Sequence, residues 1–183
     1  MNRVEALIKK YGDYVSLTWE NNLSGIERVW FAVYDKSDER RIRARVEEFD
    51  LATQRANHDW KLVDLTDAFA QWIAAHKYRD SYFEAPEDLD LALSDFKHEV
   101  AERLRAAFKS SRNSDNTVVA VQGVAGLFSF MKVSELIDEI EKDIRGRLLV
   151  FFPGIYENNN YRLLDARDGW NYMAVPIMAE AGE

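Results

Sequence analysis

The chain has 183 residues, no cysteine, and 32 acidic against 24 basic residues, which give a formal net charge of −8. Without cysteine it cannot form disulfides, thiolate zinc sites, iron–sulfur clusters or a cysteine nucleophile, and this composition suits a cytoplasmic protein. The negative charge disfavours extended contact with nucleic-acid phosphates, because non-specific nucleic-acid binding is mostly electrostatic.

The first part of the chain alternates between helix and strand patterns. Residues 4–19 carry apolar side chains at helical spacing and then run into a loop. The apolar run RVWFAVYD (28–35) predicts a strand, and an apolar stripe over 42–56 predicts the helix that follows it. WKLVDL (60–65) predicts a second strand, and the next helix places its apolar face over 65–73. This order is typical of a βαβ arrangement.

The middle of the chain continues the pattern after an interruption. Residues 77–90 break the periodicity and carry Tyr78, Tyr82 and Phe83 among charged residues, so we expect an excursion from the core. The elements after it are a helix over 93–108, a strand at VVAVQG (118–123), a helix over 133–144 and a strand at RLLVFF (147–152). Strands buried on both faces show such continuous apolar runs. The sequence therefore predicts a three-layer α/β fold with a mostly parallel sheet and helices on both faces, Rossmann-like or P-loop-like without Walker A.

The carboxy-terminal part has a different pattern. YRLLD (161–165) and WNYMAVPI (170–177) are separated by Ala-Arg-Asp-Gly, a strong hairpin signal. We expect an antiparallel hairpin that finishes the sheet at one edge, where Pro176 is tolerated because its missing amide proton does no harm. No linker or repeat divides the chain, so we expect one domain over residues 1–183. No stretch of about 18 apolar residues predicts a membrane span.

A phosphate-binding loop is the first chemistry to consider in such a sheet. Gly123 and Gly126 form the only glycine-rich turn that follows a predicted strand. Leu127 and Phe128 occupy positions where a P-loop carries polar residues, and neither a Walker A motif nor GxGxxG is present. We interpret the turn as a close entry from strand to helix, with Phe128 and Phe130 directed into the core. No nucleotide cofactor is expected.

Metal-dependent catalysis has one candidate set. The three histidines stand alone without ligand spacing, and no GxSxG elbow is present. Asp35, Asp64 and Glu157 follow predicted strands and could gather around a magnesium ion. The simpler interpretation is helix capping for the two aspartates and loop solvation for the glutamate, so we expect no catalytic or metal site.

A direct DNA contact has one candidate helix, within DERRIRARVEEF (38–49). Its four arginines lie at ion-pairing spacing from acidic residues of the same helix. The residues are Arg40, Arg41, Arg43 and Arg45 with Glu39, Glu47 and Glu48. We expect a solvated, salt-bridged face in preference to a DNA contact.

Four stretches carry a family resemblance: RVWFAVYDKSDERRIRAR, DLTDAFAQWIAAHKYRDSYFEAPEDLDL, VSELIDEIEKDIRGRLLVFFPG and YENNNYRLLDARDGWNYMAVPI. From about Tyr14 to Ile177 the chain resembles the BrxB family, small components of bacterial BREX phage-defence systems. BREX systems also contain a methyltransferase, a large ATPase and the phosphatase-like protein PglZ. The resemblance carries no catalytic residues. It implies a non-enzymatic adaptor that binds PglZ or another component, with DNA bound at most indirectly.

The candidate partner-binding residues lie after the Pro153-Gly154 break. They are the polar and aromatic residues of the expected hairpin, namely Tyr156, Asn158, Asn159, Tyr161, Trp170 and Tyr172. Aromatic side chains are favoured at interfaces because they supply contact area with little loss of entropy. The alternative for the aromatics is half-buried sheet packing. The alternative functions are a metal-dependent nuclease or nucleotide hydrolase and a direct DNA-binding module.

Overall fold

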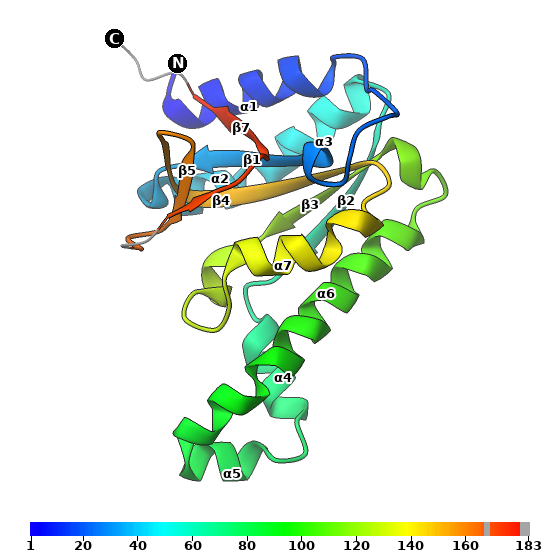
Figure 1. Cartoon of the computed structure of the whole chain (residues 1–183). Helices are drawn as coiled ribbons and strands as arrows, with labels where there is room; N and C mark the ends of the chain where they lie inside the picture. Colours follow the sequence, from blue (N-terminus) through cyan, green and yellow to red (C-terminus); the bar gives the residue numbers. More distant parts are fainter. Residues whose placement is uncertain (167–168, 180–183) are drawn as a thin grey trace.

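The computed structural model describes residues 1–166 and 169–179 (Figure 1). At Trp170 and Asn171 it describes the backbone but not the side chains. The strands in these residues are β1 (Val29–Tyr34), β2 (Asp59–Asp64), β3 (Thr117–Gln122), β4 (Arg147–Glu157), β5 (Asn160–Leu163), β6 (Trp170–Asn171) and β7 (Val175–Met178). The α-helices are α1 (Arg3–Val15), α2 (Glu39–Ala44), α3 (Val46–Arg55), α4 (Ala68–Ala75), α5 (Arg79–Glu84), α6 (Leu93–Ser110) and α7 (Val133–Ile140).

The described strands join in one seven-stranded sheet with the main order β2-β3-β4-β1-β7. Every neighbouring pair along this path is parallel. Strand β1 is buried along its whole length because its side chains enter two cores in alternation. Phe31 and Val33 belong to one core, whereas Trp30 and Ala32 belong to the other. The predicted mostly parallel sheet, covered on both faces, is confirmed.

The two cores lie on opposite faces of the sheet, under different helices (Figure 1). On one face α1 and α3 contribute Tyr11 and Phe49, whose rings pack 5.3 Å apart between centroids. On the other face α6 and α7 contribute apolar stripes that include Leu104 and Ile137. The stripe predicted over 42–56 is two helices, because the chain leaves helical geometry at Arg45.

The expected excursion takes the form of an arm, which we define as α4, α5 and the 3₁₀ segment Pro86–Ala92. Figure 1 shows that the arm and the amino-terminal half of α6 extend away from the sheet. The link from α4 back to the core is aromatic, because Phe69 stacks on Phe130 at 3.8 Å and packs against Phe96.

The carboxy-terminal strands pair differently from the expectation in one respect. Antiparallel pairing is present, because β5 pairs with β4 and β6 pairs with β5. The sheet edge, however, is β7, which runs parallel to β1. Beside β1, Val175 and Ile177 reach the apolar core beneath α1, a burial that the end of a surface hairpin would not provide. Pro176 lies in this edge strand as expected, and Arg167 and Asp168 of the predicted turn lie outside the described residues.

Candidate functional site

The carboxyl ends of β1, β2, β3 and β4 meet at one edge of the sheet, because these strands run parallel. Tyr34 at the end of β1 is in register with Pro153, and Asp64 at the end of β2 is in register with Gln122. Ligands of open α/β sheets bind outside the carboxyl ends of the strands, so a binding site is expected at this edge.

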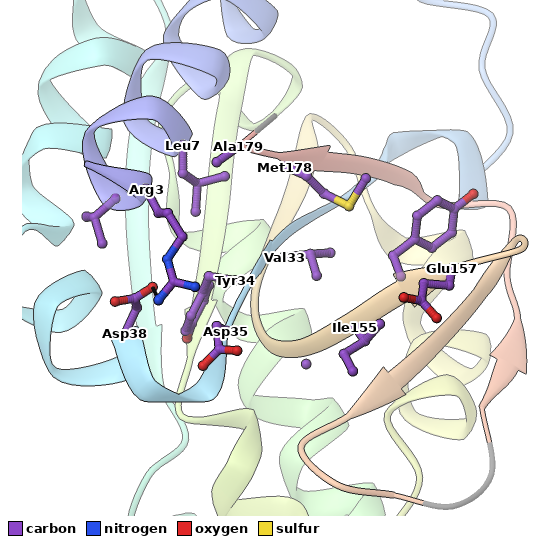
Figure 2. A pocket seen from close by; sticks show the side chains of 13 residues that line it. Arg3, Leu7, Val33, Tyr34, Asp35, Asp38, Ile155, Glu157, Met178 and Ala179 are labelled. Atoms are coloured by element: carbon purple, nitrogen blue, oxygen red, sulfur yellow. Dashed lines mark ion pairs between the residues drawn. The ribbon is translucent and has the colours of Figure 1, made fainter. Parts of the chain in front are cut away.

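A pocket of about 230 Å³ opens beside the ends of β1 and β4 (Figure 2). Its apolar lining includes Leu7 of α1, Val33 of β1 and Met178 of β7. Asp35 and Glu157 add carboxylates to the wall, and both are exposed. The pocket is slightly smaller than typical small-molecule sites, which measure about 300–1,000 Å³.

The charged residues of this pocket are engaged locally. Asp35 accepts hydrogen bonds from the amide and hydroxyl of Ser37, at 2.8 and 2.6 Å, and these bonds lower the pKa of Asp35. Arg3 pairs with Asp38 at 3.0 Å. The Asp38 carboxylate is buried and also pairs with Arg41 at 3.2 Å. The guanidinium of Arg3 therefore ties the start of α1 to the turn after β1.

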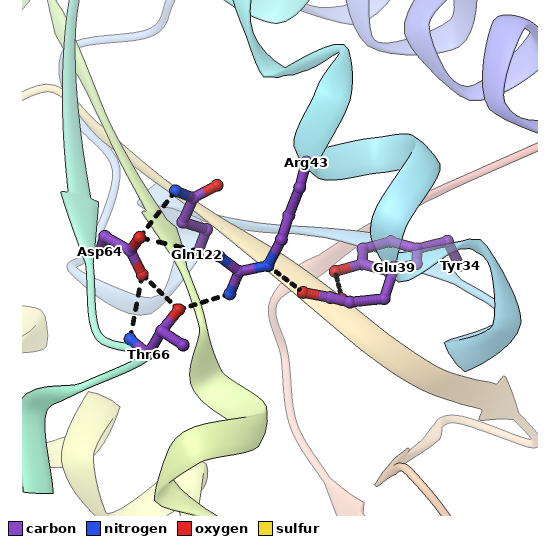
Figure 3. A network of polar contacts seen from close by, with 6 residues as sticks. All are labelled: Tyr34, Glu39, Arg43, Asp64, Thr66 and Gln122. Carbon is purple, nitrogen blue, oxygen red and sulfur yellow. Dashed lines mark hydrogen bonds and ion pairs between the residues drawn. The ribbon is translucent and has the colours of Figure 1, made fainter. Parts of the chain in front are cut away.

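A polar network lies beside the pocket and connects α2 with the ends of β2 and β3 (Figure 3). The Tyr34 hydroxyl donates to Glu39 at 2.6 Å, and Arg43 Nε donates to the other oxygen of Glu39 at 2.8 Å. Arg43 also donates to the hydroxyl of Thr66 and lies 3.7 Å from Asp64. Burial, followed by the bond to Glu39, raises the pKa of Tyr34, so the phenol stays protonated and acts as a donor.

Asp64 makes most of the contacts in the part of the network that lies at the ends of β2 and β3. It accepts hydrogen bonds from the Thr66 amide at 2.9 Å, the Thr66 hydroxyl at 2.5 Å and Gln122 Nε2 at 3.1 Å. Partial burial acts to raise the pKa of Asp64, but the bonds from Thr66 and the charge of Arg43 together lower it below its ordinary value. The aspartate is therefore charged and caps the turn after β2. It does not cap a helix as expected, because the N-cap residue of α4 is Asp67.

The glycine-rich turn after β3 packs against the turn after β2. Gly123 has a left-handed φ of 82°, and a Cβ at this position would lie 2.4 Å from the Thr66 amide nitrogen. A Cβ on Gly126 would lie 2.7 Å from the Thr66 carbonyl oxygen. The glycines thus permit a close approach between two backbone segments. Phe130 packs on the core as expected, but Phe128 is 43% exposed, because the chain turns at Ser129 with a φ of 72°.

The expected strand end at Pro153-Gly154 is wrong, because β4 continues through these residues to Glu157 and pairs there with β5 in a hairpin. Its loop is Asn158-Asn159, and both residues have positive φ, 50° and 62°, which asparagine tolerates and type I′ turns require. Gly154 is needed because a Cβ there would lie 2.0 Å from the Arg162 carbonyl oxygen. Both asparagines are exposed, and Tyr156 is partly buried with its hydroxyl 3.2 Å from Asn159 Oδ1. These three candidates lie together at the tip.

The remaining aromatic candidates do not form a displayed cluster. Tyr161 is completely buried, and its hydroxyl donates to the Ala174 carbonyl oxygen at 2.7 Å. Tyr172 is also buried, with its hydroxyl 3.3 Å from Glu141 Oε2. Their expected display at a surface is wrong, because both rings fill the core beside Phe31. The backbone of Trp170 lies in β6, and its side chain lies outside the described part of the structure.

The structure does not bring the three candidate carboxylates together. Asp35 and Glu157 line the same pocket, whereas Asp64 is held in the Arg43 network. Among residues 1–166 and 169–179, no group of three or more His, Asp or Glu side chains is arranged to hold a metal ion. The arrangement required by the metal-dependent alternative is thus not assembled in the described structure.

The arginine-rich helix carries the expected ion pairs. Three of its four arginines are paired, as Arg41–Asp38, Arg43–Glu39 and Arg45–Glu48. Arg40 makes no ion pair with any described residue. The pairing of Arg43 also shows what sequence reasoning missed, since this side chain leaves its own helix to join the network at the ends of β2 and β3. An arginine one turn after Glu39 was the only local signal.

The comparisons with known proteins agree with the family resemblance. A family profile described as "BREX protein BrxB" matches residues 61–177, more than half of the chain. Neither the curated proteins nor the solved structures give a significant match. In the described residues no helix combines the length and apolar character needed to cross a bilayer. The chain therefore belongs to the BrxB family and is a component of a BREX phage-defence system.

Proposed function

We propose that this chain is a non-catalytic adaptor that binds the phosphatase-like PglZ component of its BREX system. Membership of the BrxB family carries the proposal, because it places the chain in a multi-protein defence system. An adaptor needs a stable fold and an accessible contact surface, and it needs no reactive group. The two covered faces of the sheet provide the first requirement.

The polar residues at the carboxyl edge support a structural role. Asp35 caps the turn after β1, and Asp64 caps the turn after β2 while it pairs with Arg43. The Gly123 turn packs against the Thr66 backbone, and the Gly126 amide, which a phosphate would need as a donor, already donates to the Gly123 carbonyl oxygen at 2.9 Å. Asp35 and Asp64, two of the three carboxylates of the enzymatic alternative, thus make contacts that maintain the fold.

The hairpin tip is an accessible contact surface that fits this role. Asn158 and Asn159 are exposed in a rigid two-residue turn, so a partner can bind them with little loss of backbone entropy. Tyr156 supports the turn from within, because its ring packs 4.5 Å from Tyr161. The tip offers amide groups that both donate and accept hydrogen bonds.

The test is titration of the purified chain into purified PglZ of the same system by calorimetry. We expect saturable binding, and we expect no magnesium-dependent hydrolysis of nucleotides or DNA by the chain alone. An absence of binding at concentrations of about 100 μM, which is the range of weak transient complexes, would reject this partner. Hydrolysis that disappears in Asp35→Asn or Glu157→Gln would instead establish the enzymatic alternative.

A further inference from the structure

The arm presents three large apolar side chains to solvent within residues 78–91. Tyr78 is 53% exposed, Phe83 66% and Leu91 86%. Single exposed apolar residues are common on protein surfaces and need no explanation. Three of them lie within one short projecting segment, and exposed apolar surface gathered in one region is a feature of interaction sites.

The inner side of the arm is well packed, so this exposure is not the result of a poorly formed segment. Trp72 packs against Phe96 at 5.3 Å and against His76 at 5.0 Å. His76 in turn contacts Tyr82 at 5.2 Å and accepts a hydrogen bond from the Tyr78 amide at 3.2 Å. A continuous aromatic row therefore supports the arm, and the outward-facing side chains are presented on a fixed scaffold.

The same segment is strongly acidic. Residues 77–92 hold five acids against two bases, which leaves a net charge of −3. Both bases are occupied, because Lys77 lies over the Tyr78 ring at 4.7 Å and Arg79 donates to the Ala74 carbonyl oxygen at 2.9 Å. Four of the acids are exposed and form no ion pair within the described residues, namely Glu84, Glu87, Asp88 and Asp90.

These properties define the partner's chemistry. Apolar side chains bordered by unpaired carboxylates complement a protein surface that has an apolar pocket bordered by lysine or arginine. They do not complement nucleic acid, because the arm and the phosphate backbone carry charge of the same sign. The acids would steer the partner toward the arm and fix its orientation. The exposed apolar side chains would become buried in the partner's pocket on binding and would supply most of the affinity.

We propose that the arm is the docking surface through which this chain binds a basic, apolar-pocketed component of its defence complex, with Phe83 and Leu91 as anchors. This proposal rests on the adaptor function and adds to it a second contact surface, distant in sequence from the hairpin tip.

The experiment measures binding of the purified full-length chain to each purified protein of the same BREX system by biolayer interferometry. Two arm variants are compared, Phe83→Ser/Leu91→Ser and Glu87→Lys/Asp88→Lys. The matched control is Leu17→Ser/Leu51→Ser, which removes two apolar side chains that are 59% and 49% exposed outside the arm. Thermal melting is measured on every variant, and we expect little change because all the replaced side chains are exposed.

We expect the apolar arm variant to weaken binding about thirtyfold or more, the usual effect of losing an interface anchor. The charge variant is expected to weaken binding at low salt and to reduce the salt dependence of the affinity. The affinity of the control variant should stay within about threefold of that of the unmodified chain.

The outcomes separate this inference from the adaptor proposal. If the unmodified chain binds a component and both arm variants bind it equally well, the arm is not the docking surface and the adaptor function stands. If the unmodified chain binds none of the components, both proposals are rejected. If the apolar variant melts at a lower temperature, the charge variant decides, since its replaced side chains are exposed and unpaired in the described structure.

Discussion

Replacement of Tyr161 tests whether the hairpin aromatics belong to the core or to an interface. The ring is completely buried, at 4.6 Å from Phe31 and 5.8 Å from Phe152 between centroids. Its hydroxyl donates to the Ala174 carbonyl oxygen. Tyr161→Phe removes only the hydroxyl, whereas Tyr161→Ala removes the ring as well.

The expected losses of stability differ by several kcal/mol. Tyr161→Phe leaves a buried carbonyl oxygen without this donor, which costs ~1–3 kcal/mol. Tyr161→Ala adds the cost of the cavity, ~3–5 kcal/mol for an aromatic ring, so the total reaches ~4–8 kcal/mol. For a chain of this size each kcal/mol lowers Tm by ~2–4 °C. Tyr161→Phe should therefore lower Tm by ~2–12 °C and Tyr161→Ala by ~8 °C or more.

The assay is urea denaturation and thermal melting followed by circular dichroism. Tyr156→Phe is the matched control, because its hydroxyl bonds to Asn159 at the exposed turn, where water can replace the lost partner. It should change stability by less than about 0.5 kcal/mol. If Tyr161→Phe is as stable as the unmodified chain, the hydrogen bond to Ala174 does not stabilise the fold. If Tyr161→Ala loses partner binding without a change in Tm, the ring is not a core residue, and either result contradicts this reasoning.

Three further predictions concern the carboxyl edge of the sheet. Gly123→Ala should lose at least about 2 kcal/mol in urea denaturation, because the left-handed φ and the Thr66 backbone both oppose a Cβ; stability equal to the unmodified chain would refute this. Asp64→Asn should be less stable than the unmodified chain at neutral pH. Because folding lowers the pKa of Asp64, its contribution is present above the unfolded pKa of about 3.9 and is lost as pH falls through the folded pKa, so the difference must shrink in acid. Calorimetry should detect no saturable ATP binding, because the turn at Gly123 and Gly126 lacks the Walker A residues and the Gly126 amide already donates to the Gly123 carbonyl oxygen.

The central strands were predictable from sequence because burial on both faces leaves little freedom in residue choice. RVWFAVYD corresponds to β1, and RLLVFF to the first part of β4. The turn at Asn158-Asn159 was also readable, since asparagine tolerates the positive φ found there. In both cases local chemistry determines the local structure.

The pairing of the last strand was not predictable in the same way. The pattern of residues 170–177 is compatible with antiparallel and parallel neighbours alike. What decides the outcome is the burial of Val175 and Ile177 beneath α1, a contact between the two ends of the sequence. Such non-local packing leaves no signal in a window of ten residues.

The candidate site was predictable to a similar, limited degree. The capping role of Asp35 followed from its position after a strand, and the structure agrees, whereas Asp64 caps the turn after β2 and not the helix α4. The burial of Tyr161 and Tyr172 did not follow, because alternating aromatics look alike in a displayed hairpin and in half-buried packing. The interruption of the periodicity predicted the arm, but the sequence did not predict that Phe83 is exposed, which only the structure shows.

The position of β1 in the sheet has a consequence for biosynthesis. In the described part of the chain β1 pairs with β4 and β7, so Val29 meets Leu148 and Trp30 meets Val175. At ordinary translation speeds a ribosome needs roughly 6–24 s to travel from the first of these strands to β4. During that interval β1 has neither of its neighbouring strands, and an unpaired apolar strand is prone to aggregation. Folding of this chain is therefore a late event that involves nearly its whole length, and polypeptides that stop before β4 should aggregate instead of forming a smaller folded unit.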